Sequence, residues 1–455
     1  MNILYIHTHD SGRMVSPYGV NAPTDNLLAF ARDAAVFTQA YCAGPTCSPS
    51  RAALLTGTYP HQNGMLGLAQ RGFGLTDYRR HLAQFLGRHG YHTVLCGIQH
   101  ESGWYLDADA PGKLGYNEVL TASADPYKKE DLHLWDAVNA DHVCRWLDQA
   151  KADEPFFLSY GMHSTHRPYP VEICEAVDER YVRPPFPIDD NGETRHDQAQ
   201  FLTSAYYMDQ NFGKVIAKLK ETGLMEKTIV MFTTDHGVAL PFNKCNLTDS
   251  GIGVSLIMRV PGAKANGQVI DALVSHVDVM PTLCDLLQME KPDYLEGTSF
   301  AEVFEDISAE PVSEIFAEVN FHTSYEPIRC VRTRRYKYIR YYDESWTKLN
   351  LSNMDSSASK DFYMRNDLAA QTKDTEALYD CYYDPDERKN LAQDPRYQEI
   401  LEDLREKLRT FQIRTQDPIL HGELEMKPEY KVNKKECLNA SSKDPQDYDP
   451  RGRWQ

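Results

Sequence analysis

A cysteine with the surroundings of a reactive group is the first chemical feature of the sequence. Cys47 precedes the segment 50–56, for which a helix is predicted because Pro49 falls near its first turn and Gly57 just past its end. The free N–H groups and the dipole at a helix N-terminus favour an anion. Arg51 lies one turn further along and can face the same place. We therefore predict a polarised thiol; the simpler alternative is a half-buried cysteine at the start of a helix.

Polar clusters also stand at the ends of several predicted strands. In open α/β sheets, ligands bind outside the carboxyl ends of the strands, so clusters at such ends are expected to converge. Each cluster alone has an ordinary explanation, such as a tight turn or a hydrogen-bonded core histidine, but their repetition favours one shared site. The clusters are His9 with Asp10, Cys47, His100, His163 with His166, and Asp235 with His236.

Two of these clusters have the composition of a metal site. His9 with Asp10, and Asp235 with His236, would bring carboxylates and imidazoles together from two separate strands. Oxygen and imidazole ligands of this kind are what a divalent cation needs. The sequence therefore predicts a divalent metal ion at this edge of the sheet.

The residues around Cys47 resemble the signature of the type I sulfatases, Cys-x-Pro-x-Arg followed by Leu-Leu-Thr-Gly. Residues 47–57 read Cys-Ser-Pro-Ser-Arg-Ala-Ala-Leu-Leu-Thr-Gly. In that family the cysteine is oxidised after translation to formylglycine, which is the catalytic nucleophile. The resemblance implies an alkaline-phosphatase-like fold, a maturation enzyme that generates formylglycine, and a small anionic sulfated substrate.

The hydrated aldehyde of formylglycine suits the removal of sulfate because it carries two hydroxyls on one carbon. One hydroxyl attacks sulfur and expels the alcohol or amine. The second is then deprotonated, and cleavage of the C–O bond releases sulfate and restores the aldehyde. A serine would instead be left as a sulfate ester that needs slow attack by water at sulfur.

The resemblance also implies roles for residues around the nucleophile. Arg51 would hold the nucleophile and its helix, Lys244 would contact the sulfate and the leaving oxygen, and His166 would protonate the leaving group. His100 matches the histidine of the family's Gly-Lys-x-His motif. The lysine of that motif is replaced by Ile98, so one contact to the sulfate is missing or supplied from elsewhere.

Calcium is the metal that the resemblance implies. Asp10, Asp235 and His236 match positions of the family's ligands, and Cys47 joins them as the modified residue. His9 stands where most of the family carries aspartate, and imidazole suits softer metals better than calcium. Manganese, magnesium and zinc are therefore kept as alternatives.

Within the sulfatases the sequence resembles the N-sulfoglucosamine sulfohydrolases, or sulfamidases, over nearly the whole chain. The strings that carry this resemblance are 47–51, 61–65, 163–167, 378–380 and 384–396. It implies a sulfate ester or sulfamate of a sugar as substrate, with heparan-type glucosamine favoured, and thus a part in glycosaminoglycan degradation. The rim of the substrate pocket is predicted to include His163, Arg167, His322 and Arg329.

Composition excludes several classes of protein. The chain has 455 residues, ordinary apolar content and no run near the roughly eighteen apolar residues of a membrane helix. Its net charge of −18 argues against nucleic acid and anionic membranes as partners. Local cations and a metal must then hold the anionic substrate, which screening by salt permits. Ten scattered cysteines indicate neither a disulfide framework nor a zinc knuckle.

The expected compartment follows from the first residues. A predicted strand over residues 2–9 comes directly after Met1, without the pattern of a secretory signal. We therefore expect a cytoplasmic protein, which could form a homo-oligomer.

The order of predicted elements indicates an α/β fold. Strands over 2–9, 91–96, 156–160, 228–232, 254–260 and 315–318 alternate with helices over 26–35, 77–89, 135–149, 197–222 and 277–287. This alternation predicts a large, mostly parallel sheet flanked by helices on both faces. Strand patterns at 329–342 and 378–380 and an amphipathic helix at 395–411 predict a smaller α+β domain with an antiparallel sheet and a polar tail. The predicted domains are 1–326, catalytic, and 327–455.

Three functions are compatible with these patterns. The first is a formylglycine-dependent sulfatase. The second is a phosphodiester or phosphonate monoester hydrolase of the same superfamily, suggested by His9 and Ile98 at positions where sulfatases carry an acid and a base. The third is a non-catalytic relative that binds a metal and an anion while Cys47 stays unconverted.

Overall fold

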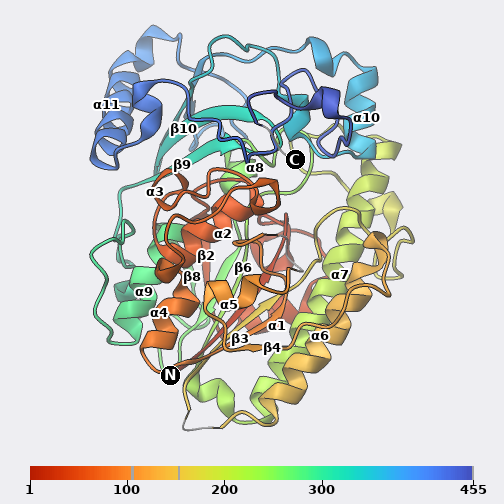
Figure 1. Cartoon of the computed structure of the whole chain (residues 1–455), viewed down its shortest axis with the longest axis vertical. Helices are drawn as coiled ribbons and strands as arrows, with labels where there is room; N and C mark the ends of the chain where they lie inside the picture. Colours follow the sequence, from red (N-terminus) through yellow and green to blue (C-terminus); the bar gives the residue numbers. More distant parts are fainter. Residues whose placement is uncertain (104–106, 152–153, 453–455) are drawn as a thin grey trace.

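An eight-stranded sheet forms the centre of the molecule (Figure 1). The computed structural model describes residues 1–103, 107–151 and 154–452. The strand order is β4-β3-β5-β1-β6-β7-β2-β8, and every neighbouring pair is parallel except the two pairs made by β7. The strands are β1 Asn2–Thr8, β2 Ala35–Tyr41, β3 His92–Gly97, β4 Glu118–Val119, β5 Phe156–Gly161, β6 Thr228–Thr234, β7 Leu256–Arg259 and β8 Val269–Ser275. The predicted α/β sheet is confirmed.

Helices cover both faces of this sheet, and for that reason its central strands are buried along their whole length. One face packs against α1 Asp25–Ala31, α6 Leu132–Leu147 and α7 Gly192–Glu221. The other packs against α2 Cys47–Thr56, α4 Leu82–Arg88, α5 Ala110–Leu114 and α9 Val279–Leu286. No helix within the described residues is both long and apolar enough to cross a membrane.

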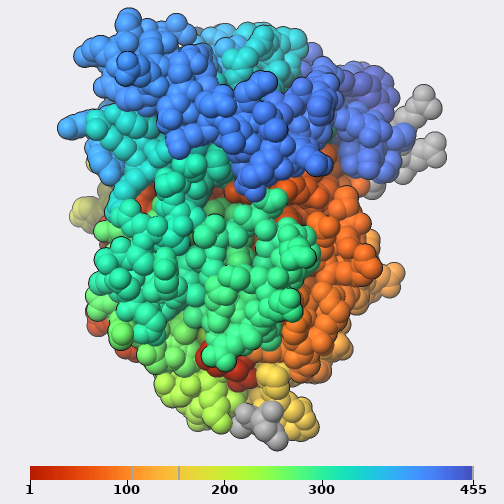
Figure 2. All heavy atoms as spheres, turned by 90° about the vertical axis from the view of Figure 1, so that its left-hand side faces the viewer, coloured from red at the N-terminus to blue at the C-terminus, as the bar shows by residue number. Residues whose placement is uncertain are grey.

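A second sheet of four antiparallel strands lies beyond the first, in the order β12-β11-β10-β9. Its strands are β9 Glu314–Phe321, β10 Tyr325–Thr333, β11 Tyr336–Tyr341 and β12 Glu376–Asp380. The apolar side of α11 Gln398–Arg414 packs on this sheet, and α10 Ala358–Arg365 packs on α7. Figure 2 shows this C-terminal part as a cap over one end of the molecule. The predicted second unit with an antiparallel sheet is confirmed.

Several predicted elements differ from those observed. The pattern predicts that the strand at 315–318 belongs to the first sheet, but β9 pairs with β10 in the second. The helix predicted over 26–35 ends at Ala31, and β2, which was not predicted, begins four residues later. The run at 254–260 forms β7, which is antiparallel to both neighbours. The helix predicted from residue 50 begins at Cys47. The division into domains at residue 326 stays a prediction.

A buried ion pair fastens the second sheet to the segment after α11. Arg329 in β10 donates two hydrogen bonds to the carboxylate of Asp417, at 2.7 and 2.9 Å, and one to the carbonyl of Val319 at 3.1 Å. Glu318 lies 3.8 Å away on the neighbouring strand. Arg329 is 0% exposed and is not among the described residues that line the large cavity, which corrects its predicted place at the pocket rim. The residue links two parts of the fold.

Removal of this cation should therefore affect stability. We expect Arg329→Met to lower the free energy of unfolding by about 3–5 kcal/mol, because it leaves Asp417 buried without its counter-charge. The matched control is Arg334→Met. Arg334 pairs with Glu310 at the surface, so its loss should leave the free energy of unfolding unchanged. Urea denaturation followed by circular dichroism measures both variants, and equal losses would contradict the assignment.

Candidate active site

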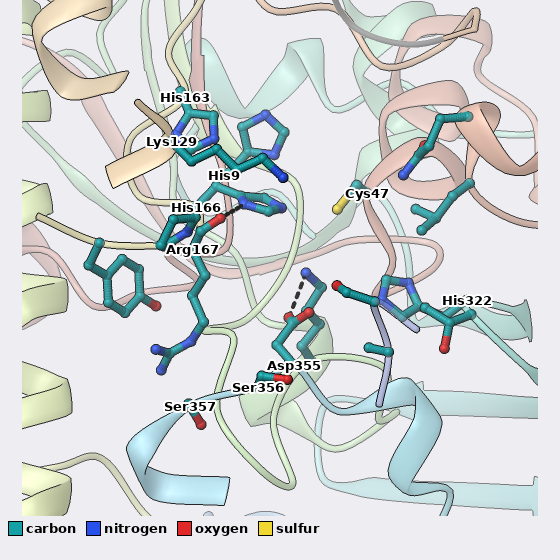
Figure 3. A pocket seen from close by; sticks show the side chains of 18 of the residues that line it. His9, Cys47, Lys129, His163, His166, Arg167, His322, Asp355, Ser356 and Ser357 are labelled. Atoms are coloured by element: carbon teal, nitrogen blue, oxygen red, sulfur yellow. Dashed lines mark hydrogen bonds and ion pairs between the residues drawn. The ribbon is translucent and has the colours of Figure 1, made fainter. Parts of the chain in front are cut away.

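The carboxyl ends of the central strands open into a cavity of about 760 Å³. Figure 3 shows its walls, with Cys47 on one side, the histidines that follow β1 and β5 on another, and residues of the C-terminal half on a third. Of the residues predicted to form the site, eight line the cavity: His9, Cys47, His100, His163, His166, Arg167, Lys244 and His322. Four others are buried next to them: Asp10, Arg51, Asp235 and His236. The structure thus brings together every predicted site residue except Arg329.

Cys47 is the first residue of α2, which ends at Gly57 in the left-handed conformation. The side chain is 2% exposed, and its Sγ lies 3.5 Å from Nε2 of His236. Burial raises the pKa of the thiol well above its usual value, although Lys244 acts in the opposite direction. The surroundings of the unmodified Cys47 therefore favour the neutral thiol, whereas its place at a helix start predicts a polarised one.

Arg51 fastens α2 to the ends of two strands. Its Nη2 donates to the carbonyl of Thr8 at 2.8 Å and to Oδ2 of Asp235 at 3.0 Å, and its Nη1 contacts Nδ1 of His7. Burial alone would raise the pKa of the Asp235 carboxyl, but His236, Arg51 and His9 hold it well below its usual value. Asp235 is therefore ionised. Arg51 lies beneath the cavity, where it holds α2 against the strand ends.

Four buried side chains form a group that could hold a metal ion. One potential ligand atom from each of His9, Asp10, Cys47 and Asp235 lies within 4.8 Å of all the others. Asp10 adopts a left-handed backbone conformation with φ 46°, and its N–H donates to Oδ1 of Asp235 at 2.8 Å. The turn after β1 is thereby tied to the end of β6, which brings the two predicted clusters together.

Two imidazoles lie at this group, His9 as one of its members and His236 beside it. Nδ1 of His9 lies 3.1 Å from Oδ2 of Asp235, and Nδ1 of His236 lies 2.9 Å from the carbonyl of Gly237. Because the Gly237 carbonyl only accepts hydrogen bonds, Nδ1 of His236 carries a proton, while its Nε2 lies 3.2 Å from Oδ1 of Asp10. Nε2 of His9 is buried and has no hydrogen-bond partner among the described residues. The residues present therefore fit a divalent cation.

The wall after β5 carries two histidines on a firmly held loop. Asp136 in α6 accepts hydrogen bonds from the N–H groups of His163 and Ser164, at 2.7 and 2.8 Å. Burial raises the pKa of this carboxyl to about 7, while those bonds favour its ionised form. Nδ1 of His166 contacts the carbonyl of Arg167, so that Nε2 is the nitrogen available to a substrate. The His166 ring stands edge-on to that of His9 at 5.3 Å.

The cations around the cavity differ in how far they are already paired. Lys244 lies 3.1 Å from Oδ2 of Asp10 and 3.0 Å from Oδ2 of Asp355. Both Nη atoms of Arg167 donate hydrogen bonds to the carboxylate of Asp197, at 2.7 and 2.9 Å. Lys129, from the 3-10 helix Lys129–Asp131, makes no ion pair within the described parts of the chain and extends along the His163 wall into the cavity (Figure 3).

Sequence reasoning missed three residues of the site. Asp355 and Lys129 line the cavity, and Gln70 faces it while contacting Nε2 of His100 at 2.6 Å. None of the three stands in a recognisable motif or at the end of a predicted strand, so the sequence held no signal for them. Ile98 also lines the cavity and adds an apolar surface there.

Comparison with known proteins assigns the chain to a family. A sequence model of the sulfatase family matches residues 1–289, and a model of the C-terminal part of N-sulphoglucosamine sulphohydrolase matches residues 235–377. The protein therefore belongs to the sulfatase family and is a sulfuric ester hydrolase. Among individual relatives it is 30% identical to the human N-sulphoglucosamine sulphohydrolase, over 92% of this chain and 91% of that protein.

Solved structures confirm the fold. A 2-O GAG sulfatase superimposes with a TM-score of 0.69 and 22% identity, over 98% of each chain. A phosphonate monoester hydrolase from Silicibacter pomeroyi gives a TM-score of 0.69 and 19% identity, over 94% of this chain and 98% of that one. At such identities the likeness shows the fold alone, and the two activities must be distinguished by experiment.

The metal group leads to a direct prediction. We expect purified protein to contain about one divalent ion per chain, and Asp10→Asn to lower the occupancy at least about tenfold, because it removes a charged ligand while keeping its shape. Dialysis followed by mass-spectrometric analysis of calcium, manganese, magnesium and zinc measures this. The exposed Asp33→Asn serves as control. Metal-free wild-type protein, or full occupancy in Asp10→Asn, would contradict the assignment.

Proposed function

We propose that the protein removes the sulfate of a sulfated sugar, with N-sulfated glucosamine of heparan-type glycans as the favoured substrate, and that Cys47 is converted to formylglycine for this purpose. The proposal covers sulfate esters and sulfamates. Its main support is the place of Cys47, the one cysteine among the described residues that line the cavity. It stands beside the metal group and faces the same cavity as Lys244 and His166.

Two groups absent from the unmodified chain would supply part of the chemistry. Formylglycine, once hydrated, provides the hydroxyl that attacks sulfur. A divalent cation, held by His9, Asp10, Asp235 and His236, provides positive charge next to that nucleophile. Calcium is the ion that the family resemblance favours, whereas the two imidazole ligands suit manganese or zinc better.

Side chains of this chain would bind and orient the sulfate. Lys244 is buried beside Cys47 and keeps its charge, since Asp10 and Asp355 raise the pKa of its ammonium well above the usual value although burial lowers it. Lys129, an exposed side chain that makes no ion pair within the described residues, adds a cation from the opposite wall. These charges would act at short range on the developing negative charge and outweigh the distant field of a chain with a net charge of −18.

His166 would move the proton of the leaving group. Its Nδ1 proton is held by the carbonyl of Arg167, so a second proton on Nε2 would be directed into the cavity. The leaving oxygen or nitrogen of a sugar is strongly basic and needs this proton as its bond to sulfur breaks. His100 and His163 line the same region, and burial lowers the pKa of both.

Other parts of the hypothesis stay predictions. They are a maturation enzyme that acts on Cys47, a cytoplasmic location and a homo-oligomeric state. The alternative activities, phosphodiester or phosphonate monoester hydrolysis and binding without turnover, are separated from the sulfatase by the experiments below.

Conversion of Cys47 can be measured directly. In active protein from its native host we expect the peptide that contains residue 47 to carry oxygen in place of sulfur and two hydrogens fewer. Cys47→Ala should lose turnover of N-sulfoglucosamine and of 4-nitrophenyl sulfate by at least about a thousandfold. The matched control is Cys42→Ala, a neighbouring buried cysteine outside the cavity lining. Only cysteine at position 47 in active enzyme, or a preference for aryl phosphodiesters in kcat/KM, would refute the proposal.

The role of His166 predicts a dependence on the leaving group. We expect His166→Ala to lower kcat/KM for N-sulfoglucosamine by about 10²–10⁴, because its amine departs poorly without a proton. For 4-nitrophenyl sulfate, whose leaving group is stable as an anion, the loss should be much smaller. Steady-state kinetics on both substrates measures the difference. Equal losses on the two substrates would show that His166 acts in some other way.

A further inference from the structure

One wall of the cavity, contributed by the C-terminal half, presents a carboxylate to the substrate. Asp355 lines the cavity together with Ser356 and Ser357 (Figure 3). Its side chain is 22% exposed, and Oδ2 lies 3.0 Å from Nζ of Lys244. Burial alone would raise the pKa of this carboxyl, but Lys244 holds it below its usual value. Asp355 is therefore an anion at neutral pH.

The loop that carries this carboxylate is fixed from both sides. Oδ1 of Asn353 accepts a hydrogen bond from the N–H of Ser324 at 2.9 Å, which ties the loop to the turn between β9 and β10. Nζ of Lys360 donates to the carbonyls of Leu351 and Met354, both at 2.8 Å. A carboxylate held in this way can accept a hydrogen bond without a large loss of conformational entropy.

A neutral imidazole lines the cavity from the same half of the chain. His322 is 4% exposed, and its Nδ1 has no hydrogen-bond partner in the described parts of the chain. Burial, and then Lys244, lowers the pKa of its imidazole well below the usual value, so the ring is uncharged at neutral pH. A buried polar atom without a partner is costly unless a ligand or water completes it. His322 and Asp355 thus both have hydrogen-bonding capacity for a bound molecule.

The charges around Lys244 determine which groups this wall would accept. The lysine has carboxylates on two sides, Asp10 toward the metal group and Asp355 toward the cavity. Its single positive charge is already shared between two negative ones. A second sulfate placed against Asp355 would meet the negative charge of this carboxylate, whereas a hydroxyl would find an acceptor.

We propose that Asp355 is a specificity-determining residue, whose carboxylate accepts a hydrogen bond from the sugar hydroxyl next to the sulfated position and excludes a second sulfate there. This inference rests on the proposed function and specifies its substrate class: sugars with a free hydroxyl vicinal to the group that is cleaved. His322 would complete the same wall as a neutral hydrogen-bonding partner.

The test compares three sugars and one aryl ester. For the wild type we expect kcat/KM on N-sulfoglucosamine to exceed that on its 3-deoxy analogue at least about tenfold, and that on its 3-O-sulfate about a hundredfold. Asp355→Asn should reduce the discrimination against the 3-O-sulfate to about fivefold or less, because the negative charge is removed. Turnover of 4-nitrophenyl sulfate, which has no hydroxyl, should fall less than turnover of N-sulfoglucosamine, because both substrates lose the support of Lys244 but only the sugar also loses a hydrogen bond.

The matched control is Asp361→Asn, which removes the same charge from an exposed position on α10 and should leave all four values unchanged. Equal losses of Asp355→Asn on the sugar and on 4-nitrophenyl sulfate would overturn the proposal, because Asp355 would then act only by positioning Lys244. If Asp355→Asn does not fold, the wild type alone tests the proposal. Equal kcat/KM on N-sulfoglucosamine and on its 3-deoxy analogue would then refute the hydrogen bond from the sugar hydroxyl to Asp355. Hydrolysis of 4-nitrophenyl sulfate without any hydrolysis of N-sulfoglucosamine would refute both the proposed sugar and this inference while leaving the sulfatase chemistry intact.

Discussion

The guanidinium of Arg51 donates one hydrogen bond to the carboxylate of Asp235 and a second to the carbonyl of Thr8, both out of contact with solvent. A buried ion pair needs further hydrogen bonds to offset its desolvation, and Oδ1 of Asp235 accepts them from the N–H groups of Asp10 and His236, at 2.8 and 3.0 Å. Cys47 stands one helical turn before Arg51 on α2, so the pair that holds the arginine also fixes the position of Cys47. The site therefore depends on one carboxylate that serves the helix and the metal group at once.

This arrangement explains how an acidic protein can bind an anion. Lys244 is brought to the cavity by the loop after β6, and the carboxylates on either side keep it charged in spite of burial. A divalent cation would offset the carboxylates of the metal group, which leaves the lysine and the ion as positive charges close to the sulfate. Distant surface acids are screened at physiological salt, whereas these buried groups are not. What the cavity binds is therefore determined by where its charged groups lie and not by the net charge of the chain.

Much of the site could be predicted because its residues follow strands with strong apolar patterns. β1, β5 and β6 are buried throughout, and the polar residues after them converge as parallel strand ends must. The position of Arg329 could not be predicted in this way, because an alternating strand pattern does not tell what covers each face. Its partner Asp417 is 88 residues away in the sequence. Asp355 escaped prediction for the same reason, since only the fold brings its loop to Lys244.

The histidines of the cavity differ in how deeply they are buried, and this difference gives chemically identical side chains different properties. Burial lowers the pKa of His100 to about 3 and also lowers that of His163 and His322, so these three imidazoles stay neutral as the pH passes through neutrality. They can orient a substrate by hydrogen bonds but add no charge that would compete with the lysines for the sulfate. His166 is more exposed to the cavity than His163. The histidine proposed to donate a proton to the leaving group is therefore the least buried of the histidines that line the cavity in the described part of the chain.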